Sequence, residues 1–459
     1  MLDYAMGGRG DNLGPVHRTS LCLHLANTAL IATLIYLLFG RPWVAAAAAV
    51  LFGIHPMTVE TICWVGERKT LLAAFFSLSS MVLYVLYSRG CAWRYYAASL
   101  AAFMFALMSK PTSLPVPMLL LLLDFWPLNR LNRSAVLEKM PFFVLAAVSA
   151  AIGYSSQKLT AVVVTPGFED RWLRIPLIVC HDIVFYLHKM FWPVNLSSHY
   201  PFPKPMSLSN PAVAAGVAAT FVLLTALLIS LRRTRALMTG WLFFLVGVLP
   251  TMQVVRFSDV IAADKFAYLP SVGILLILAW LLIRLGTNVS RKAWRGATVA
   301  ALVLVAGLEA FATRSYLADW SDSITLFRRM TALSPNSFMV HYGLGNAYRD
   351  QNRMVEAIEA YRRSLKLKPD YAEAHSNLGI TLADVGRRDQ AAEAFAAAVR
   401  IKPDYAEGRT NFGVALMWQG KLDEAMVHCA KAVELAPDDL DANINIGAVL
   451  AAKGKLQDA

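Results

Sequence analysis

Long hydrophobic runs fill the chain up to about residue 314, and short polar stretches separate them. Each run approaches the length of about 17 to 25 residues that a helix needs to cross the hydrocarbon core of a bilayer. The pattern therefore predicts a bundle of spanning helices. Their expected ranges are 21–39, 42–62, 70–88, 92–108, 112–126, 140–155, 211–231, 238–255, 266–284 and 297–313.

The stretch 172–192 is long enough to span, but five of its side chains are charged or ionisable, namely Arg174, His181, Asp182, His188 and Lys189. Such groups are costly in lipid unless they face a cavity. Clusters of Arg and Lys between spans identify cytoplasmic loops. These clusters alternate consistently with the predicted spans only if 172–192 is re-entrant or interfacial.

The basic clusters used for this count are Arg89 with Arg94, the run 130–139, the triplet Arg232, Arg233 and Arg235, and the group Arg284, Arg291, Lys292 and Arg295. With these clusters in the cytoplasm, the opposite side holds residues 1–20, the loops near 55–69, 109–112, 156–171 and 256–265, and everything after the last span. We therefore expect a multi-pass membrane protein, of the kind found in a bacterial inner membrane, whose C-terminal region is extracytoplasmic.

The C-terminal region repeats itself every 34 residues, because Pro335, Pro369, Pro403 and Pro437 are equally spaced. This period is typical of tetratricopeptide repeats, which are helical hairpins that bury their apolar faces by stacking on one another. Small residues recur at repeat positions 8, 20 and 27, where two helices approach closely. The sequence thus predicts an all-α protein, in which a polytopic helical membrane bundle is followed by an α-solenoid.

Four segments follow from these patterns. Residues 1–20 form an extracytoplasmic segment, 21–314 the membrane domain, 315–337 a linker with a partial repeat helix, and 338–459 three full repeats and one truncated repeat. The fourth repeat stops at its position 20, which indicates truncation or completion by residues outside this sequence.

Charge and cysteine content add little chemistry. The net charge is +12, but much of the excess lies in the basic clusters that set topology, so no nucleic-acid partner is expected. The five cysteines are scattered without a C-x-x-C spacing, so they indicate neither a disulfide framework nor a metal site.

Polar residues at the predicted membrane edge are the candidate functional groups. The densest set is His55, Glu60, Arg68 and Lys69, and the loops on the same predicted side add Lys110, Asp264, Lys265 and Tyr268. If this stretch is helical, Glu60, Trp64 and either Glu67 or Arg68 share one face, and this face would offer an acid, an aromatic ring and a cation to a lipid phosphate or a sugar. Simple neutralisation of Glu60 by Arg68 is an equally good interpretation.

Three further positions favour structural roles. Asp124, within Asp-Phe-Trp-Pro at the predicted cytoplasmic end, is expected to belong to an interfacial aromatic anchor. His24 and Asn27 lie on one helical face and are expected to form hydrogen bonds within the bundle.

Taken in order, these motifs resemble one family. His17-x3-Leu21-x-Leu23-His24-x2-Asn27, His55-Pro56-x3-Glu60-x3-Trp64-x2-Glu67-Arg68-Lys69, Met108-Ser109-Lys110, Asp264-Lys265-x2-Tyr268-Leu269-Pro270 and the repeats are similar to the transmembrane and tetratricopeptide-repeat proteins related to protein O-mannosyltransferases. The resemblance covers nearly the whole chain.

This resemblance implies a glycosyltransferase of the large multi-span (GT-C) type that takes a mannose-like sugar from a polyprenyl-phosphate donor to Ser or Thr hydroxyls of proteins. Such chemistry needs cations for the departing lipid phosphate and a carboxylate for the hydroxyl proton. The donor-site candidates are His55, Glu60, Arg68, Lys69, Lys110, Asp264, Lys265 and Tyr268. No cofactor other than the lipid-linked substrate is expected and no metal ligand is identified, while the metal dependence of the reaction stays open.

The catalytic residue stays unassigned. The family is expected to carry its acidic motif in a loop after an earlier span, and Asp3 and Asp11 do not match that motif. The chain is therefore expected to be truncated at its N-terminus, or impaired in catalysis.

The repeats offer a ladder of Asn377, Asn411 and Asn445 at repeat position 6. These amides are candidates for holding the backbone of an acceptor peptide, although asparagine is also common at this position. The main alternative function is an inactive membrane-anchored scaffold for protein–protein interaction. A transporter ranks last, because the halves of the membrane region show no internal symmetry.

Overall fold

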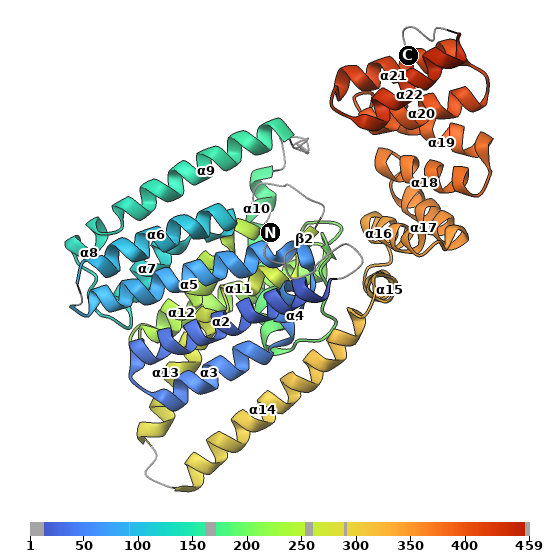
Figure 1. The fold of residues 1–459 in the computed structure, drawn as a ribbon. Coiled ribbons are helices and arrows are strands. Elements are labelled where there is room, and N and C mark those ends of the chain that lie inside the picture. Colours follow the sequence, from blue (N-terminus) through green and yellow to red (C-terminus); the bar gives the residue numbers. More distant parts are fainter. Residues whose placement is uncertain (1–12, 91, 161–170, 253–259, 289–291, 455–459) are drawn as a thin grey trace. The chain divides into compact units, whose positions relative to one another are not determined.

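The computed structural model describes residues 13–90, 92–160, 171–252, 260–288 and 292–454. The chain divides into two compact units, Met1–Ala318 and Asp319–Ala459, each helical throughout almost all of its described length (Figure 1). The expected all-α fold, with apolar helices followed by tetratricopeptide-type hairpins, is confirmed. Asp3, Asp11 and parts of the loops 156–171 and 256–265 lie outside the described residues.

The first unit contains the following elements. They are α2 (Gly14–Phe39), α3 (Pro42–Ile54), α4 (Val59–Cys63), α5 (Arg68–Ser88), α6 (Arg94–Ser109), α7 (Val116–Phe125), α8 (Arg133–Leu137), α9 (Met140–Thr160), α10 (Arg171–Phe191), β1 (Tyr200–Pro201), α11 (Pro211–Ser230), α12 (Ala236–Val248), β2 (Val260–Ala262), α13 (Val272–Asn288) and α14 (Lys292–Asp319). Single 3-10 turns cover Pro56–Thr58, Val65–Glu67, Pro111–Ser113, Leu249–Thr251 and Asp264–Ala267.

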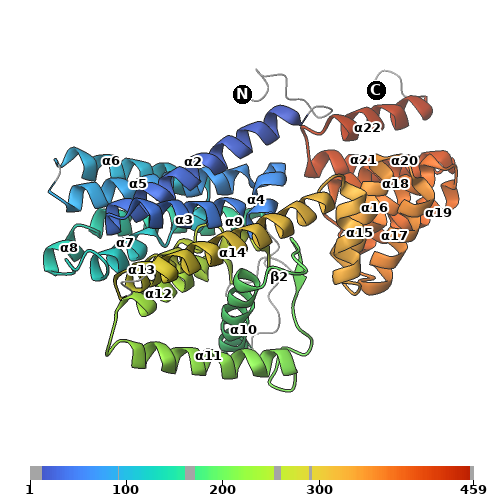
Figure 2. The same ribbon diagram turned by 90° about the horizontal axis from the view of Figure 1, so that it is seen from below.

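The helices of this unit pack side by side around one apolar core. In Figures 1 and 2, α2 lies between α3 and α5, α6 follows α5, and α13 lies beside α3 and α12. Fully buried Ile31, Leu34, Phe103 and Leu119 come from α2, α6 and α7, so the core is continuous from one side of the bundle to the other. Helices α10 and α11 pack mainly on each other.

Five described helices are long and apolar enough to cross a membrane: Gly14–Phe39, Val65–Ser88, Arg133–Ser156, Pro211–Ser230 and Gly296–Asp319. A sixth is possible if the pair Pro42–Ile54 and Pro56–Cys63, bent by 57°, forms one broken span. The sequence predicted this bent pair as one continuous helix, 42–62. The observed break follows from Pro56, which leaves the preceding His55 extended at ψ 130°.

Three other predicted spans form helices shorter than 18 residues, the length that we take for a spanning candidate. The runs predicted at 112–126, 238–255 and 266–284 form the apolar helices Pro111–Phe125, Ala236–Thr251 and Val272–Gly286, each below 18 residues. The ambiguous stretch 172–192 is a helix, α10, with Pro176 inside it and His188 and Lys189 in its last turn. A short antiparallel pair, Tyr200 opposite Ala262, follows it.

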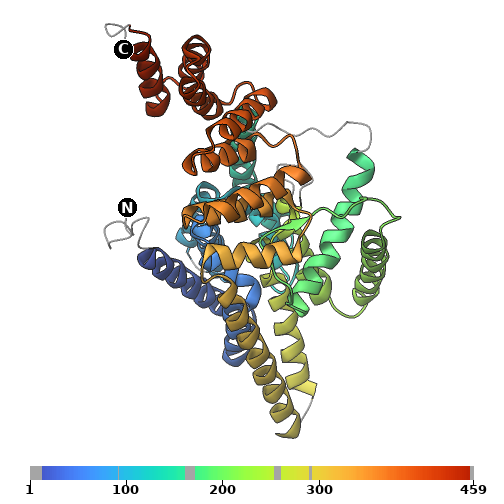
Figure 3. The same cartoon turned by 90° about the vertical axis from the view of Figure 1, so that its right-hand side faces the viewer.

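The second unit is a stack of helical hairpins. Its elements are α15 (Ser323–Leu333), α16 (Phe338–Asp350), α17 (Met354–Leu367), α18 (Ala372–Asp384), α19 (Arg388–Ile401), α20 (Ala406–Trp418), α21 (Leu422–Leu435) and α22 (Leu440–Ala452). Each helix packs on the next, as Figure 3 shows for the red and orange part of the chain. α15 acts as the second helix of a hairpin by packing on α16.

Repeat positions 8 and 24 explain the close approach of paired helices. A Cβ added to Gly345 would lie 2.5 Å from the Tyr361 ring, and one added to Gly379 would lie 2.6 Å from the Phe395 ring. Both rings are buried. Glycine is thus required because the large side chain at position 24 occupies the space beside its backbone.

Position 4 supplies a second repeated contact. His341, His375, Arg409 and Asn443 each donate a side-chain hydrogen bond to the carbonyl of the repeat proline six residues earlier, at 2.9, 2.9, 2.6 and 2.8 Å. The residue type varies, but each side chain carries an N–H donor. These bonds satisfy the carbonyl at every turn between hairpins.

We expect Gly379→Ala to destabilise the solenoid by about 1–3 kcal/mol, because the methyl group overpacks against Phe395. The gain in helix propensity of roughly 1 kcal/mol does not offset this strain fully. Pulse proteolysis of the full-length protein in a urea series measures the effect. Val427→Ala, at an exposed position of α21, is the control, and Phe395→Leu should relieve part of the strain. Unchanged resistance of Gly379→Ala would contradict the packing argument.

Candidate functional site

A four-membered ionic network joins three segments that are distant in sequence. The Lys265 ammonium lies 3.2 Å from Glu60 Oε1 and 3.1 Å from Glu67 Oε1. The other oxygen of Glu67 lies 2.8 Å from the Lys110 ammonium. Glu67 therefore bridges two lysines, with one oxygen on each. Two carboxylates and two ammonium groups balance each other within this network.

Local backbone breaks position these side chains. α4 ends at Trp64, which is extended at ψ 112°, and a 3-10 turn then carries Glu67 to the start of α5. Lys110 is likewise extended at the end of α6, ahead of Pro111. Lys265 follows β2, and its backbone N–H donates to Glu60 Oε2 at 2.9 Å. Each charged group thus sits at a helix end, where the chain can turn it inward.

The network keeps Lys265 charged. Burial alone would lower the pKa of Lys265, but the carboxylates of Glu60 and Glu67 outweigh it and raise this pKa above its ordinary value. The ammonium also lies 4.7 Å from the centre of the Trp64 ring. For Lys110, burial dominates and lowers the pKa, although Glu67 opposes this.

Asp264, next to Lys265, is fully buried and accepts hydrogen bonds from two tyrosines. The Tyr200 hydroxyl lies 2.9 Å from one oxygen and the Tyr316 hydroxyl 3.1 Å from the other. Burial, followed by the negative charge of Glu60, raises the pKa of Asp264 well above its ordinary value. Asp264 is therefore placed to fix β1 and α14 around the loop that carries Lys265.

The remaining sequence candidates lie around this network. Arg68 and Lys69 begin α5, with Arg68 half-buried and Lys69 exposed. The charge of Lys69 is near enough to contribute to the lowered pKa of Lys110. The buried Tyr268 hydroxyl bonds His24 Nδ1 at 2.7 Å and Asn27 Nδ2 at 3.2 Å. The expected bundle role of His24 and Asn27 agrees with these contacts.

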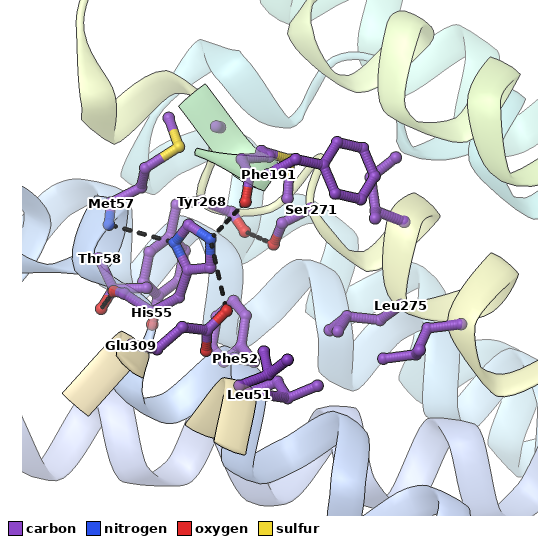
Figure 4. Close-up of a pocket in the computed structure, with 15 residues that line it drawn as sticks. Leu51, Phe52, His55, Met57, Thr58, Phe191, Tyr268, Ser271, Leu275 and Glu309 are labelled. Carbon is purple, nitrogen blue, oxygen red and sulfur yellow. Dashed lines mark hydrogen bonds and ion pairs between the residues drawn. The ribbon is translucent and has the colours of Figure 1, made fainter. Parts of the chain in front are cut away.

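An apolar cavity of about 200 Å³ is lined in part by Ala267, Tyr268 and Ser271, which follow Lys265 in the chain, and Figure 4 shows its lining. Leu51, Phe52, Ile274, Leu275 and Leu278 form much of its wall. His55, Thr58, Tyr268, Ser271 and Glu309 supply its polar groups. His55 and Tyr268 thus face an apolar space, whereas Glu60, Lys110 and Lys265 form the ionic network.

Both ring nitrogens of His55 are engaged. Nδ1 accepts the backbone N–H of Met57 at 3.2 Å, and Nε2 lies 3.0 Å from the carbonyl oxygen of Met190. A nitrogen that accepts from a backbone N–H carries no proton, so the ring is a neutral Nε2–H tautomer. The Glu309 carboxylate lies 4.0 Å from Nε2, and a dashed line marks this pair in Figure 4. His55 therefore acts as a fixed donor.

A second ionic cluster lies where α7, α8 and α9 meet. Asp124 and Lys139 form an ion pair with both side chains fully buried. The Tyr84 hydroxyl donates to Asp124 at 2.7 Å, and Arg130 pairs with Glu138 at 2.8 Å beside it. Lys139 makes burial of the Asp124 carboxylate possible, and an interfacial position for the Asp-Phe-Trp-Pro stretch stays a prediction.

We expect Lys139→Met to destabilise the first unit by about 3–5 kcal/mol, because it leaves Asp124 buried and unpaired. Asp124→Asn in the same chain should recover much of the loss. Thermal unfolding of the purified protein in detergent, followed by circular dichroism, compares the variants. Arg133→Gln, at an exposed position, is the control. If Lys139→Met alone is as stable as the parent, the role assigned to this pair is contradicted.

The asparagines of the repeats are engaged within the solenoid. Asn377 Nδ2 donates to the Tyr342 hydroxyl and to Asn346 Oδ1, both at 2.9 Å, and Asn411 Nδ2 donates to Ser376 Oγ at 3.3 Å. These bonds link neighbouring repeats. Binding of an acceptor peptide by Asn377, Asn411 and Asn445 stays a prediction.

Sequence reasoning missed several groups. Glu67 was visible as one end of a charged triplet, but its bridging role needed Lys110 and Lys265 in space. Glu309 was visible as an acid within an apolar run, which marks a functional candidate. Among the residues that the structure describes, no three His, Cys, Asp or Glu side chains are grouped to hold a metal ion.

Comparisons with known proteins support both halves of the sequence interpretation. Two family models match the repeats, "TPR repeat" over residues 345–386 and "Tetratricopeptide repeat" over 382–442. Protein O-mannosyl-transferase F38B6.6 of Caenorhabditis elegans is 22% identical over 358 residues, which are 74% of this chain and 50% of that protein. Protein O-mannosyl-transferase TMTC4 of Homo sapiens is 23% identical, over 78% of this chain and 55% of that protein.

The chain spans about half the length of these curated relatives. Among solved structures, YrrB, a TPR protein with an unusual peptide-binding site, is 26% identical with a TM-score of 0.27, over 29% of this chain and 68% of that chain. The expected resemblance is thus confirmed: this is a helical membrane protein with tetratricopeptide repeats that is similar to protein O-mannosyl-transferases.

Proposed function

We propose that this protein transfers a mannose-like sugar from a polyprenyl-phosphate donor to Ser or Thr hydroxyls of proteins outside the cytoplasm. The single observation that carries the proposal is the pairing of Lys110 and Lys265 on one buried carboxylate, since it defines a place where an anion is held. The names of the relatives support the reaction class.

The two lysines are the proposed ligands of the donor phosphate. Both are more than four-fifths buried, and a charge-assisted hydrogen bond is strong where water is excluded. Thr70, Thr112, Ser113 and Thr251 line the small cavity beside them, and the hydroxyls of Thr112 and Ser113 are proposed as further donors. Arg68 and Lys69, at the start of α5, are proposed to assist at its edge.

The larger cavity is the proposed site for the beginning of the hydrocarbon chain. The segment 265–270 contributes Lys265 to one cavity and Tyr268 to the other, so an amphiphile at this loop could keep its phosphate and its chain on separate surfaces. The walls of the larger cavity are mostly apolar, and burial of each methylene group stabilises binding by about 0.8 kcal/mol.

In the proposed reaction the acceptor oxygen bonds to the anomeric carbon while the bond from that carbon to the phosphate oxygen breaks. The phosphate leaves with the bonding electrons, and the ammonium groups of Lys110 and Lys265 stabilise its growing charge. The proton of the acceptor hydroxyl passes to a general base that remains unassigned. The repeats are proposed to bind the acceptor or a partner protein on the extracytoplasmic side.

We expect the purified full-length protein to add one hexose to a Ser/Thr-containing peptide when supplied with polyprenyl-phosphate mannose, as measured by mass spectrometry. Lys110→Gln and Lys265→Gln should each lower kcat/KM by roughly 10- to 100-fold, because each removes a charged hydrogen bond of about 1.5–3 kcal/mol. The exposed Lys204→Gln is the control. Donor binding without any transfer would favour the scaffold function instead.

A larger side chain in the larger cavity should weaken binding of the donor's hydrocarbon chain and leave binding of its phosphate group nearly unchanged. Ile274→Trp is expected to weaken binding of a long-chain polyprenyl phosphate at least about tenfold, since bulk added to a packed site costs about 1–3 kcal/mol. Binding of a phosphate with a very short chain should change much less. Titration calorimetry with both lipids makes the comparison, and equal weakening of the two would argue against this site for the chain.

A further inference from the structure

We propose that the Glu67 carboxylate is an internal substitute for the donor phosphate: it occupies the lysine pair before the donor arrives and must leave it for the donor to bind. This inference rests on the proposed function. It assigns Glu67 as a positioning residue that sets donor affinity and product release.

The contacts of Glu67 are those that one anionic group would make with two cations. One carboxylate oxygen lies 3.1 Å from the Lys265 ammonium and the other 2.8 Å from the Lys110 ammonium. The hydroxyl of Thr70 donates to the second oxygen. A phosphate bound by the same lysines would need the same donors, so both anions cannot hold them fully at once.

Space leads to the same conclusion. The cavity lined by Lys110, Lys265, Thr70 and Ser113 measures about 30 Å³. That volume suits about one or two water molecules and is too small for a phosphate group with four oxygens. A donor phosphate can therefore reach the ammonium groups only if a neighbouring group moves.

Glu67 is better placed to move than Glu60. Glu60 is fully buried and also accepts the backbone N–H of Lys265, so its displacement would leave a buried donor unpaired. Glu67 lies in a single 3-10 turn between α4 and α5, and this turn begins directly after the exposed Trp64. Its side chain retains 10% of its surface exposed. Only Glu67 contacts both lysines.

Charge balance explains why Glu67 and the donor phosphate replace each other at the lysines. With Glu67 in place the two lysines are neutralised, and a second anion in this buried site would be repelled. When the sugar has been transferred, the return of Glu67 to the lysines would expel the lipid phosphate. A permanent competitor of this kind lowers donor affinity but prevents the product from remaining bound.

The test measures binding of farnesyl phosphate to the full-length protein by titration calorimetry. Glu67→Gln should bind it at least about tenfold more tightly than the parent, because the amide no longer competes for the ammonium groups. Glu60→Gln is the comparison: it removes one carboxylate from Lys265 but leaves Glu67 on both lysines, so it should tighten binding clearly less than Glu67→Gln. In steady-state transfer, Glu67→Gln should lower both KM and kcat as product release becomes slow.

Each alternative outcome has a distinct meaning. Weaker binding to Glu67→Gln would overturn the inference, because Glu67 would then be needed to hold the lysines in place. Equal tightening in Glu60→Gln would also overturn it, since general electrostatics would explain both. If Glu67→Gln does not fold, Glu67→Asp replaces it: the carboxylate keeps its charge but is drawn back by one methylene group, so its contacts with the lysines weaken and binding should tighten, though less than the amide is expected to cause.

The proposed function can fail separately. If the parent binds farnesyl phosphate and Lys265→Gln abolishes that binding, the donor site stands whatever Glu67 does. If neither the parent nor any variant binds the lipid phosphate, the donor site itself is refuted, and the inference falls with it.

Discussion

Pairing of charges inside an apolar bundle is the constraint on which the first unit depends. An isolated charge taken out of water costs several kcal/mol, so every buried carboxylate or ammonium needs a partner within contact distance. Glu60 and Glu67 obtain theirs from Lys265 and Lys110, and Asp124 from Lys139. These pairs join α4, the turn before α5, the end of α6 and the loop before α13, and they join α7 to the residue before α9, and so fix which helices are neighbours.

The same constraint explains why the helices break where they do. Glu60, Glu67 and the Trp64 ring all contact the Lys265 ammonium, but the segment that carries them is α4, an extended residue and a 3-10 turn in place of one continuous helix. The breaks at Pro56 and Trp64 and the extended Lys110 allow Glu60, Glu67 and Lys110 to turn inward. The backbone of Lys265 is then tied to Glu60. The solenoid uses another device: small residues at position 8 and a larger side chain at position 24 recur every 34 residues, as Gly345 with Tyr361 and Gly379 with Phe395 show.

The sequence predicted the existence and approximate limits of most helices, since hydrophobic length and the 34-residue period are local properties. It also selected Glu60, Lys110 and Lys265 as one functional group. It could not identify their ion-pair partners, because Glu60 and Lys265 are 205 residues apart. Arg68, Lys69 and Lys110 lie nearer to Glu60 in the sequence and were equally suitable as its partner. Asp124 shows the same limit: its aromatic neighbours favoured an interface, and only the position of Lys139 reveals burial. Pro56 and Pro111 were available signals for the breaks.

In both ionic clusters described for the first unit, buried charges are paired, but the two clusters differ in how much of the pair is exposed to solvent. Asp124 and Lys139 are both fully buried, so nothing can enter between them and their role is to hold helices together. In the other network the side chains of Lys110, Glu67 and Lys265 each retain 10 to 14% of their surface exposed, and a small cavity lies beside them. A sealed pair contributes only to the fold. A pair with residual access and a displaceable carboxylate can exchange its partner, and for that reason we place binding at Glu67 and structural support at Asp124.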